Sequence, residues 1–110
     1  MGKFNVGDVL TVPFPHHDLK IAKKRPVVVL ADLPGQDILI CAITSKAYSS
    51  SYVIPLTDAD MASSTLRVSS HARPEKLFAI TEFLVKKKIG TLSSETLQRI
   101  KDTIKIILNI

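Results

Sequence analysis

Residues 7–30 read GDVLTVPFPHHDLKIAKKRPVVVL, and this stretch carries most of the fold prediction. Two strand-like apolar runs, 8–12 and 27–31, flank a polar loop with two adjacent histidines. Pro13 and Pro15 are expected to end the first strand, because proline cannot donate to a sheet ladder. The second run is rich in β-branched residues and is typical of a strand buried on both faces. The Lys-Lys-Arg-Pro before it puts cations at the mouth of a buried strand, a position that suits a phosphate-rich partner.

The next part of the chain predicts a hairpin and then more short strands. Pro34-Gly35 is a turn signal, and 38–44 is a second buried strand, so 25–44 forms a hairpin. Small polar residues over 45–51 predict a loop, and 57–65 predicts a surface connection. Further strand-like segments follow, with 83–92 open between a short strand and a turn: 52–56, 66–79 and 83–92.

The end of the chain predicts an amphipathic helix. Ser93 is suited to cap it, because its hydroxyl accepts a bond from an unpaired backbone N–H, and Glu95 lies in the positive first turn and pairs with Arg99. An apolar stripe recurs at helical spacing through Leu97, Ile100, Ile104 and either Ile107 or Leu108. Many short strands followed by one helix predict a mainly β fold with α, a small bent sheet or barrel closed by the C-terminal helix. At 110 residues, 1–110 is expected to be a single domain.

Composition limits the classes of function. Apolar residues make up 45% and charged residues 23%, which is ordinary for a globular protein and argues against disorder. The net charge of +5 favours nucleic acid or acidic protein partners. The one cysteine, Cys41, lies in an apolar strand pattern and is expected to be a buried structural thiol. No signal-peptide core and no apolar run of about 20 residues occurs, which predicts a cytoplasmic protein without a membrane span.

Several common chemistries lack their motifs. The sequence has no Gly-rich phosphate loop, no zinc-like Cys or His spacing and no Gly-x-Ser-x-Gly elbow. His16 and His17 are adjacent, so on an extended chain they point apart and are poorly placed to chelate one ion. Asp58 and Asp60 lack the other ligands of a calcium loop. We therefore expect a function that uses no metal and no cofactor.

Two polar groups meet if the hairpin forms. Arg25 begins one strand and Thr44 ends the other, so antiparallel pairing brings them to the same end of the sheet. A guanidinium matches phosphate oxygens with its planar fork, although a solvated charge before a strand is the ordinary interpretation of Arg25. Thr44, followed by Ser45 and Lys46, is suited to phosphate binding, although such residues usually only complete turns. Arg73 and Glu75 face one side of an extended segment and form either an exposed ion pair or an acid–base pair.

The series of motifs resembles the PemK/MazF-type toxins of toxin–antitoxin systems. The matching segments appear in the right order over nearly the whole chain: GDVL-x-VPF from Gly7, KRPVVVL from Lys24, AITS from Ala42, S-x-x-RPEKLF from Ser70 and IG-x-LS from Ile89. The resemblance implies a small SH3-like, CcdB/PemK-type barrel that forms a homodimer, cleaves single-stranded RNA without a metal and binds a cognate antitoxin protein. It also makes Arg25 and Thr44 the central catalytic pair.

The resemblance also suggests roles for other residues. In a related branch of the family, an Arg and an Asp spaced like Arg73 and Glu75 are implicated as acid and base. The positions expected to contact RNA are His16, His17, Lys23, Lys24, Ser45 and Lys46, and the two histidines are alternative bases. Two other functions stay open on the same fold: a gyrase-poisoning, CcdB-like toxin, and a non-catalytic module that binds RNA or protein.

Overall fold

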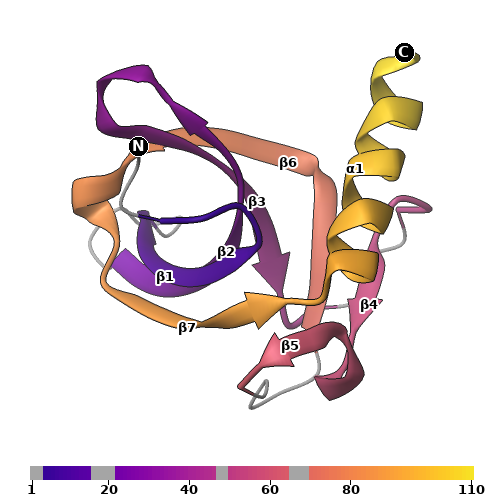
Figure 1. The fold of residues 1–110 in the computed structure, drawn as a ribbon, viewed down its shortest axis with the longest axis horizontal. Helices are drawn as coiled ribbons and strands as arrows, with labels where there is room; N and C mark the ends of the chain where they lie inside the picture. Colours follow the sequence, from indigo (N-terminus) through magenta and orange to yellow (C-terminus); the bar gives the residue numbers. More distant parts are fainter. Residues whose placement is uncertain (1–3, 16–21, 47–49, 65–69) are drawn as a thin grey trace.

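A computed structural model describes residues 4–15, 22–46, 50–64 and 70–110 of the chain. Within these ranges the chain forms strands, short 3₁₀ turns and one α-helix (Figure 1). The elements are β1 (Asp8–Pro15), β2 (Ala22–Leu33), η1 (Pro34–Gln36), β3 (Asp37–Thr44), β4 (Ile54–Leu56), η2 (Asp58–Asp60), β5 (Met61–Ser63), β6 (Ser70–Thr81), η3 (Glu82–Leu84), β7 (Lys87–Leu92) and α1 (Ser94–Leu108). The mainly β fold with a C-terminal helix is therefore confirmed.

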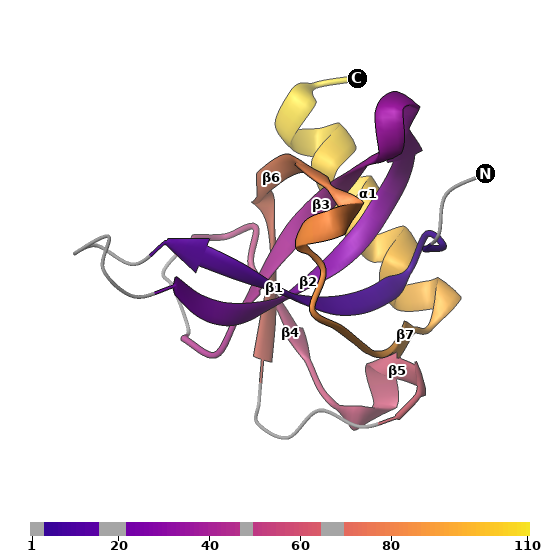
Figure 2. The same cartoon turned by 90° about the vertical axis from the view of Figure 1, so that its left-hand side faces the viewer.

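The strands form one curled sheet in the order β4-β6-β3-β2-β1-β7-β5. Each neighbouring pair in this sheet is antiparallel. The sheet curls into a half-barrel that has β1 and β2 among its central strands, and α1 lies beside β6 at the open side of this half-barrel (Figures 1 and 2). The predicted hairpin over 25–44 forms through β2, η1 and β3, with Gly35 at a positive φ of 74° in the turn. Glycine adopts this left-handed conformation without a steric penalty.

Alternating residues of the strands form two cores, one on each face of the sheet. One face, covered by α1, contains Val9, Val28, Cys41, Ile43, Ile54, Leu56, Ala72, Leu92 and Ile100. The opposite face contains Leu10, Val12, Val27, Val29, Ile38 and Ile40. Cys41 is thus fully buried in the α1-side core, as its apolar neighbours predicted.

The helix begins and packs as its sequence predicted. The hydroxyl of Ser93 accepts a hydrogen bond from the backbone N–H of Thr96 at 3.2 Å, which caps the first turn. Ile100 is fully buried, and Leu97 and Ile104 pack against the same core. The last position of the stripe is Ile107, because Leu108 is 57% exposed.

The first turn of α1 is fastened to the sheet by Asp60. Its carboxylate accepts a 2.6 Å hydrogen bond from the hydroxyl of Thr96 and a 2.7 Å bond from the backbone N–H of Thr57. Arg99 lies 3.9 Å from the same carboxylate, so the predicted pairing of Arg99 with Glu95 was wrong. The carboxylate of Asp60 attracts the guanidinium because its position at the helix start is fixed.

Two strand boundaries were also predicted wrongly. β1 continues through Pro13 and Pro15, which pair with Lys24 and Ala22 of β2. The pairing of β1 with β7 ends at Thr11, so this half of β1 has one open edge, where a missing N–H leaves no ladder bond unmade. β2 accordingly begins at Ala22, inside the segment expected to be loop.

The middle of the chain is more regular than its sequence indicated. The expected surface connection contains η2 and β5, and β5 pairs with β7. A Cβ at Gly90 would lie 2.7 Å from the side chain of Met61 and 2.8 Å from the carbonyl oxygen of Ser63, so the close approach of these strands requires glycine. The pieces around Arg73 form one long strand, β6, whose register shifts opposite Cys41 and Ala42. No helix in the described ranges has the length and apolarity needed to cross a membrane.

Candidate active site

Polar side chains gather on one face of the sheet where β2, β3 and β6 lie side by side. Thr44 of β3 is directly opposite His71 of β6. Ala42, two residues before Thr44 and on the same face, is opposite Arg73. Ala42 is also opposite Val27 of β2, the point at which the β2–β3 pairing ends. Cross-strand partners share a face, so this face continues the core opposite α1 and becomes polar at one end.

Arg25 lies on the same face, two residues beyond Val27, just as Thr44 lies two residues beyond Ala42. On its other side Arg25 is opposite Val12 of β1. Arg25 is partly exposed, and Lys24 is exposed. The structure thus places Arg25 and Thr44 on one face and at the same end of neighbouring strands.

Thr44 is held in a defined geometry. Its residue is only 8% exposed, and its hydroxyl oxygen accepts a 3.2 Å hydrogen bond from the backbone N–H of Lys46. Among the described residues, nothing accepts the hydroxyl proton, so the group retains a hydrogen to donate. Ser45 and Lys46 follow as exposed residues at the end of the strand. Thr44 is therefore a hydrogen-bond donor in a fixed position at the end of β3, next to the exposed residues Ser45 and Lys46.

Arg73 and Glu75 bind each other. The Nη2 and Nε atoms of Arg73 both donate to Oε2 of Glu75, at 3.0 Å and 3.2 Å. The side chains are 14% and 22% exposed, so this is a largely buried ion pair rather than the exposed one that was the alternative. The other carboxylate oxygen, Oε1, is buried and has no hydrogen-bond partner in the part of the chain that the structure describes.

His71 is the residue that the sequence analysis missed. It is half-buried opposite Thr44, with Pro55 of β4 on its other side. Its Nδ1 atom is buried and has no hydrogen-bond partner among the described residues. A signal was available, since residues 71 and 73 of an extended strand share a face. What the sequence did not give was the strand opposite His71.

The other predicted contact residues are only partly placed. Lys23 lies in β2, opposite Phe14 of β1. His16 and His17 lie outside the described residues. Within the described ranges, no group of three His, Cys, Asp or Glu side chains is close enough to hold a metal ion.

Cys41 lies in this region of the sheet but is not suited to nucleophilic chemistry. Its thiol donates a 3.2 Å hydrogen bond to the carbonyl oxygen of Arg73. Burial raises the pKa of Cys41 to about 12, and the nearby charge of Glu75 adds to the rise. The thiolate is the reactive form, so Cys41 stays protonated and inert at neutral pH.

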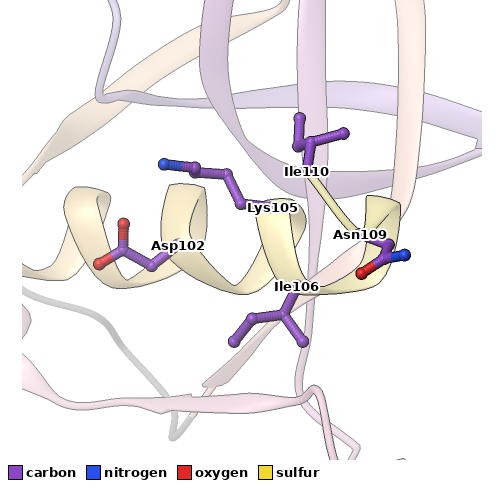
Figure 3. Close-up of a pocket in the computed structure, with 5 residues that line it drawn as sticks. All are labelled: Asp102, Lys105, Ile106, Asn109 and Ile110. Atoms are coloured by element: carbon purple, nitrogen blue, oxygen red, sulfur yellow. The ribbon is translucent and has the colours of Figure 1, made fainter.

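A shallow hollow lies at the C-terminal end of α1. It is lined by Asp102, Lys105, Ile106, Asn109 and Ile110 (Figure 3). These side chains lie along the last turns of the helix, whose end is at the top of Figures 1 and 2, away from β4. The residues that line the hollow include one cation, Lys105, and no buried hydroxyl group such as that of Thr44.

A match over most of the sequence identifies the protein family to which this chain belongs. Residues 5–108 match the family described as PemK-like, MazF-like toxin of type II toxin-antitoxin system. The chain therefore belongs to the PemK/MazF toxin family. A comparison with curated protein sequences gave no significant match.

Solved structures with a similar fold include MazF proteins and endoribonucleases. A MazE–MazF complex from Deinococcus radiodurans is 14% identical, with a TM-score of 0.77 and coverage of 97% of each chain. The Mycobacterium tuberculosis toxin MazF-mt6 is 17% identical, with a TM-score of 0.72 over 94% of this chain and 97% of that one. An endoribonuclease in complex with its cognate antitoxin, from a Mycobacterial species, is 9% identical, with a TM-score of 0.75 over 96% and 94%. At these identities the likeness establishes the fold.

Proposed function

We propose that this chain, as one toxin domain, is a metal-independent endoribonuclease that cleaves single-stranded RNA at short specific sequences and so inhibits translation and growth. The observation that carries the proposal is the placement of Arg25 and Thr44 on one face at the same end of β2 and β3. It agrees with the family to which the chain belongs and with similar structures described as endoribonucleases.

The proposed reaction uses the ribose itself as the nucleophile. The 2′-OH loses its proton and attacks the adjacent phosphorus, and the bond to the 5′-oxygen of the next nucleotide breaks. Thr44 donates its free hydroxyl hydrogen to a phosphate oxygen and orients the group. Arg25 stabilises the additional negative charge of the phosphorane with its fork of donors and protonates the departing 5′-oxygen. DNA, which lacks the 2′-OH, is bound but not cut.

Other residues of the face support binding and proton transfer in this proposal. Lys24, Ser45 and Lys46 are exposed beside Arg25 and Thr44. In this proposal they contact RNA phosphates, together with Lys23, His16 and His17. Arg73 is opposite Ala42, two residues before Thr44 on β3, and it is bonded to Glu75. Glu75 is a candidate proton acceptor.

The proposed partners are a second copy of the chain and a cognate antitoxin. Similar structures are complexes of MazF with MazE and of an endoribonuclease with its antitoxin. The net charge of +5 suits an acidic, partly disordered antitoxin segment that covers the RNA-binding face. The protein is expected to act in the cytoplasm.

The proposal is tested by incubating the purified protein with a long single-stranded RNA of mixed sequence, in the presence of EDTA, and sequencing the product ends. We expect cleavage at a short recurring sequence, 2′,3′-cyclic phosphate ends, and no cleavage of DNA of the same sequence. Arg25→Ala should reduce the rate by at least about 10²-fold, as does loss of one donor to a developing oxyanion. Thr44→Val, which keeps the shape and removes the hydroxyl, should act in the same direction.

Lys101→Ala, on the exposed face of α1, is the matched control and should cleave at the wild-type rate. Unchanged circular dichroism spectra would show that the Arg25 and Thr44 variants fold. Wild-type cleavage by folded Arg25→Ala would contradict the assignment. If no RNA is cut but gyrase is inhibited in a supercoiling assay, the chain is a gyrase poison. Salt-dependent RNA binding without products would identify a binding module.

A further inference from the structure

We propose that His71 is the general base of the RNA cleavage reaction, a proposal that rests on the proposed function. The observation behind it is a row across three adjacent strands: Arg25 on β2, Thr44 on β3 and His71 on β6. Thr44 and His71 are direct cross-strand partners. The sheet order β6-β3-β2 puts Arg25 and His71 on opposite sides of Thr44.

This arrangement matches the geometry of the reaction. In an in-line displacement, the attacking and leaving oxygens lie on opposite sides of the phosphorus. A phosphate bound by Thr44 therefore needs its base on one side and its leaving-group partner on the other. Where the three strands are paired, at Val27, Ala42 and Arg73, two strand spacings of about 10 Å in total separate the backbones of β2 and β6, and Arg25 lies two residues beyond the last paired position of β2. Arg25 and His71 are the groups on the two sides.

The imidazole of His71 is not used elsewhere in the described part of the chain. A structural histidine is normally held through hydrogen bonds at its ring nitrogens, because buried polar atoms are nearly always paired. Here Nδ1 is buried without a partner, and no other described residue bonds to the ring. The residue is half-buried, so the ring is positioned by packing while its second nitrogen stays accessible. A bound substrate reaches the ring through this second nitrogen.

The surroundings favour His71 over Glu75 as the base. The neighbours facing His71 do not titrate, since they are Thr44 on β3 and Pro55 on β4. On β6, the charged residue next along the face is Arg73, which is bonded to Glu75. Oε2 of Glu75 already accepts two hydrogen bonds from Arg73, and Glu75 lies four residues further along β6.

The proton balance of the step is complete. The free ring nitrogen of His71 takes the 2′-OH proton as the O2′–P bond forms. The P–O5′ bond breaks on the side of Arg25, which gives a proton to the 5′-oxygen. His71 then releases its proton to water, and Arg25 regains one from water. The products are a 2′,3′-cyclic phosphate and a 5′-hydroxyl, and no oxidation or metal is involved.

The test measures single-turnover cleavage of a short RNA with one mapped site between pH 5 and 9. For His71→Gln and His71→Ala, we expect the rate at pH 7.5 to fall about 10²–10⁴-fold, the usual contribution of general acid–base catalysis. The rise of the wild-type rate with pH, as the base loses its proton, should disappear in both variants. Added imidazole should partly restore His71→Ala. The affinity for the same RNA with a 2′-deoxy nucleotide at the cleaved position should stay within about two-fold of wild type.

A second substrate separates a base from an acid. Replacing the bridging 5′-oxygen with sulfur gives a leaving group that needs no protonation, so loss of a base should slow this substrate as much as normal RNA. A defect that vanishes with sulfur would make His71 the acid and overturn the proposal. So would a wild-type rate and pH profile in folded His71→Gln, or a defect explained entirely by weaker binding. If wild-type protein cuts no RNA, the proposed function itself fails.

Discussion

Replacement of Ile100 by alanine tests the packing of α1 onto the sheet. Ile100 is fully buried in the α1-side core, which it shares with residues of the sheet such as Val28 and Ile43. The substitution removes three carbons, and at about 0.8 kcal/mol for each buried carbon this loses about 2.4 kcal/mol. The cavity that remains should raise the destabilisation to about 3–4 kcal/mol, within the range for such substitutions. That is a large part of the stability of a small domain.

Ile106→Ala is the matched control, because Ile106 is in the same helix and is 69% exposed. The change in helix propensity is the same in both variants, so the difference between them reports burial alone. Urea denaturation at one fixed protein concentration should show a free energy of unfolding lowered by about 3–4 kcal/mol for Ile100→Ala. The control should change by no more than about 0.5 kcal/mol. Equal effects of the two substitutions would refute the inference that Ile100 anchors the helix.

Two further predictions concern ionisable groups away from the face that carries Arg25 and Thr44. Burial raises the pKa of Asp60, but the hydrogen bonds from Thr96 and Thr57 and the charge of Arg99 outweigh it and hold the pKa below its ordinary value of 3.8. This contribution to stability is present above that value and is lost as the pH falls through the folded-state pKa, so the stability difference between wild type and Asp60→Asn should shrink below about pH 4, and a constant difference would contradict the assignment. Cys41, whose pKa burial raises to about 12, should resist iodoacetamide at pH 8 in the native protein and react in urea, as followed by mass spectrometry.

Much of the fold could be predicted from local patterns. The cap at Ser93, the helical stripe through Ile100 and the turn at Pro34-Gly35 depend on residues close together in the chain, so their physics is complete within a short segment. The errors had a common cause. Pro13 and Pro15 are compatible with a strand because one edge of β1 is open there, and Arg99 pairs with Asp60 because η2 is brought to the start of α1.

The sequence by itself determined that Arg25 and Thr44 lie at the same end of the two strands of a hairpin, and that the chain belongs with the PemK/MazF toxins. Only the tertiary structure decided which residue faces Thr44 from its other side. That residue is His71, 27 positions later in the chain, and its pairing depends on a register shift in β6 opposite Cys41 and Ala42. A shift of one residue reverses the face of every side chain beyond it. Strand alternation restricts each side chain to one of the two faces of the sheet. The pairing between distant strands determines which of the two faces it lies on.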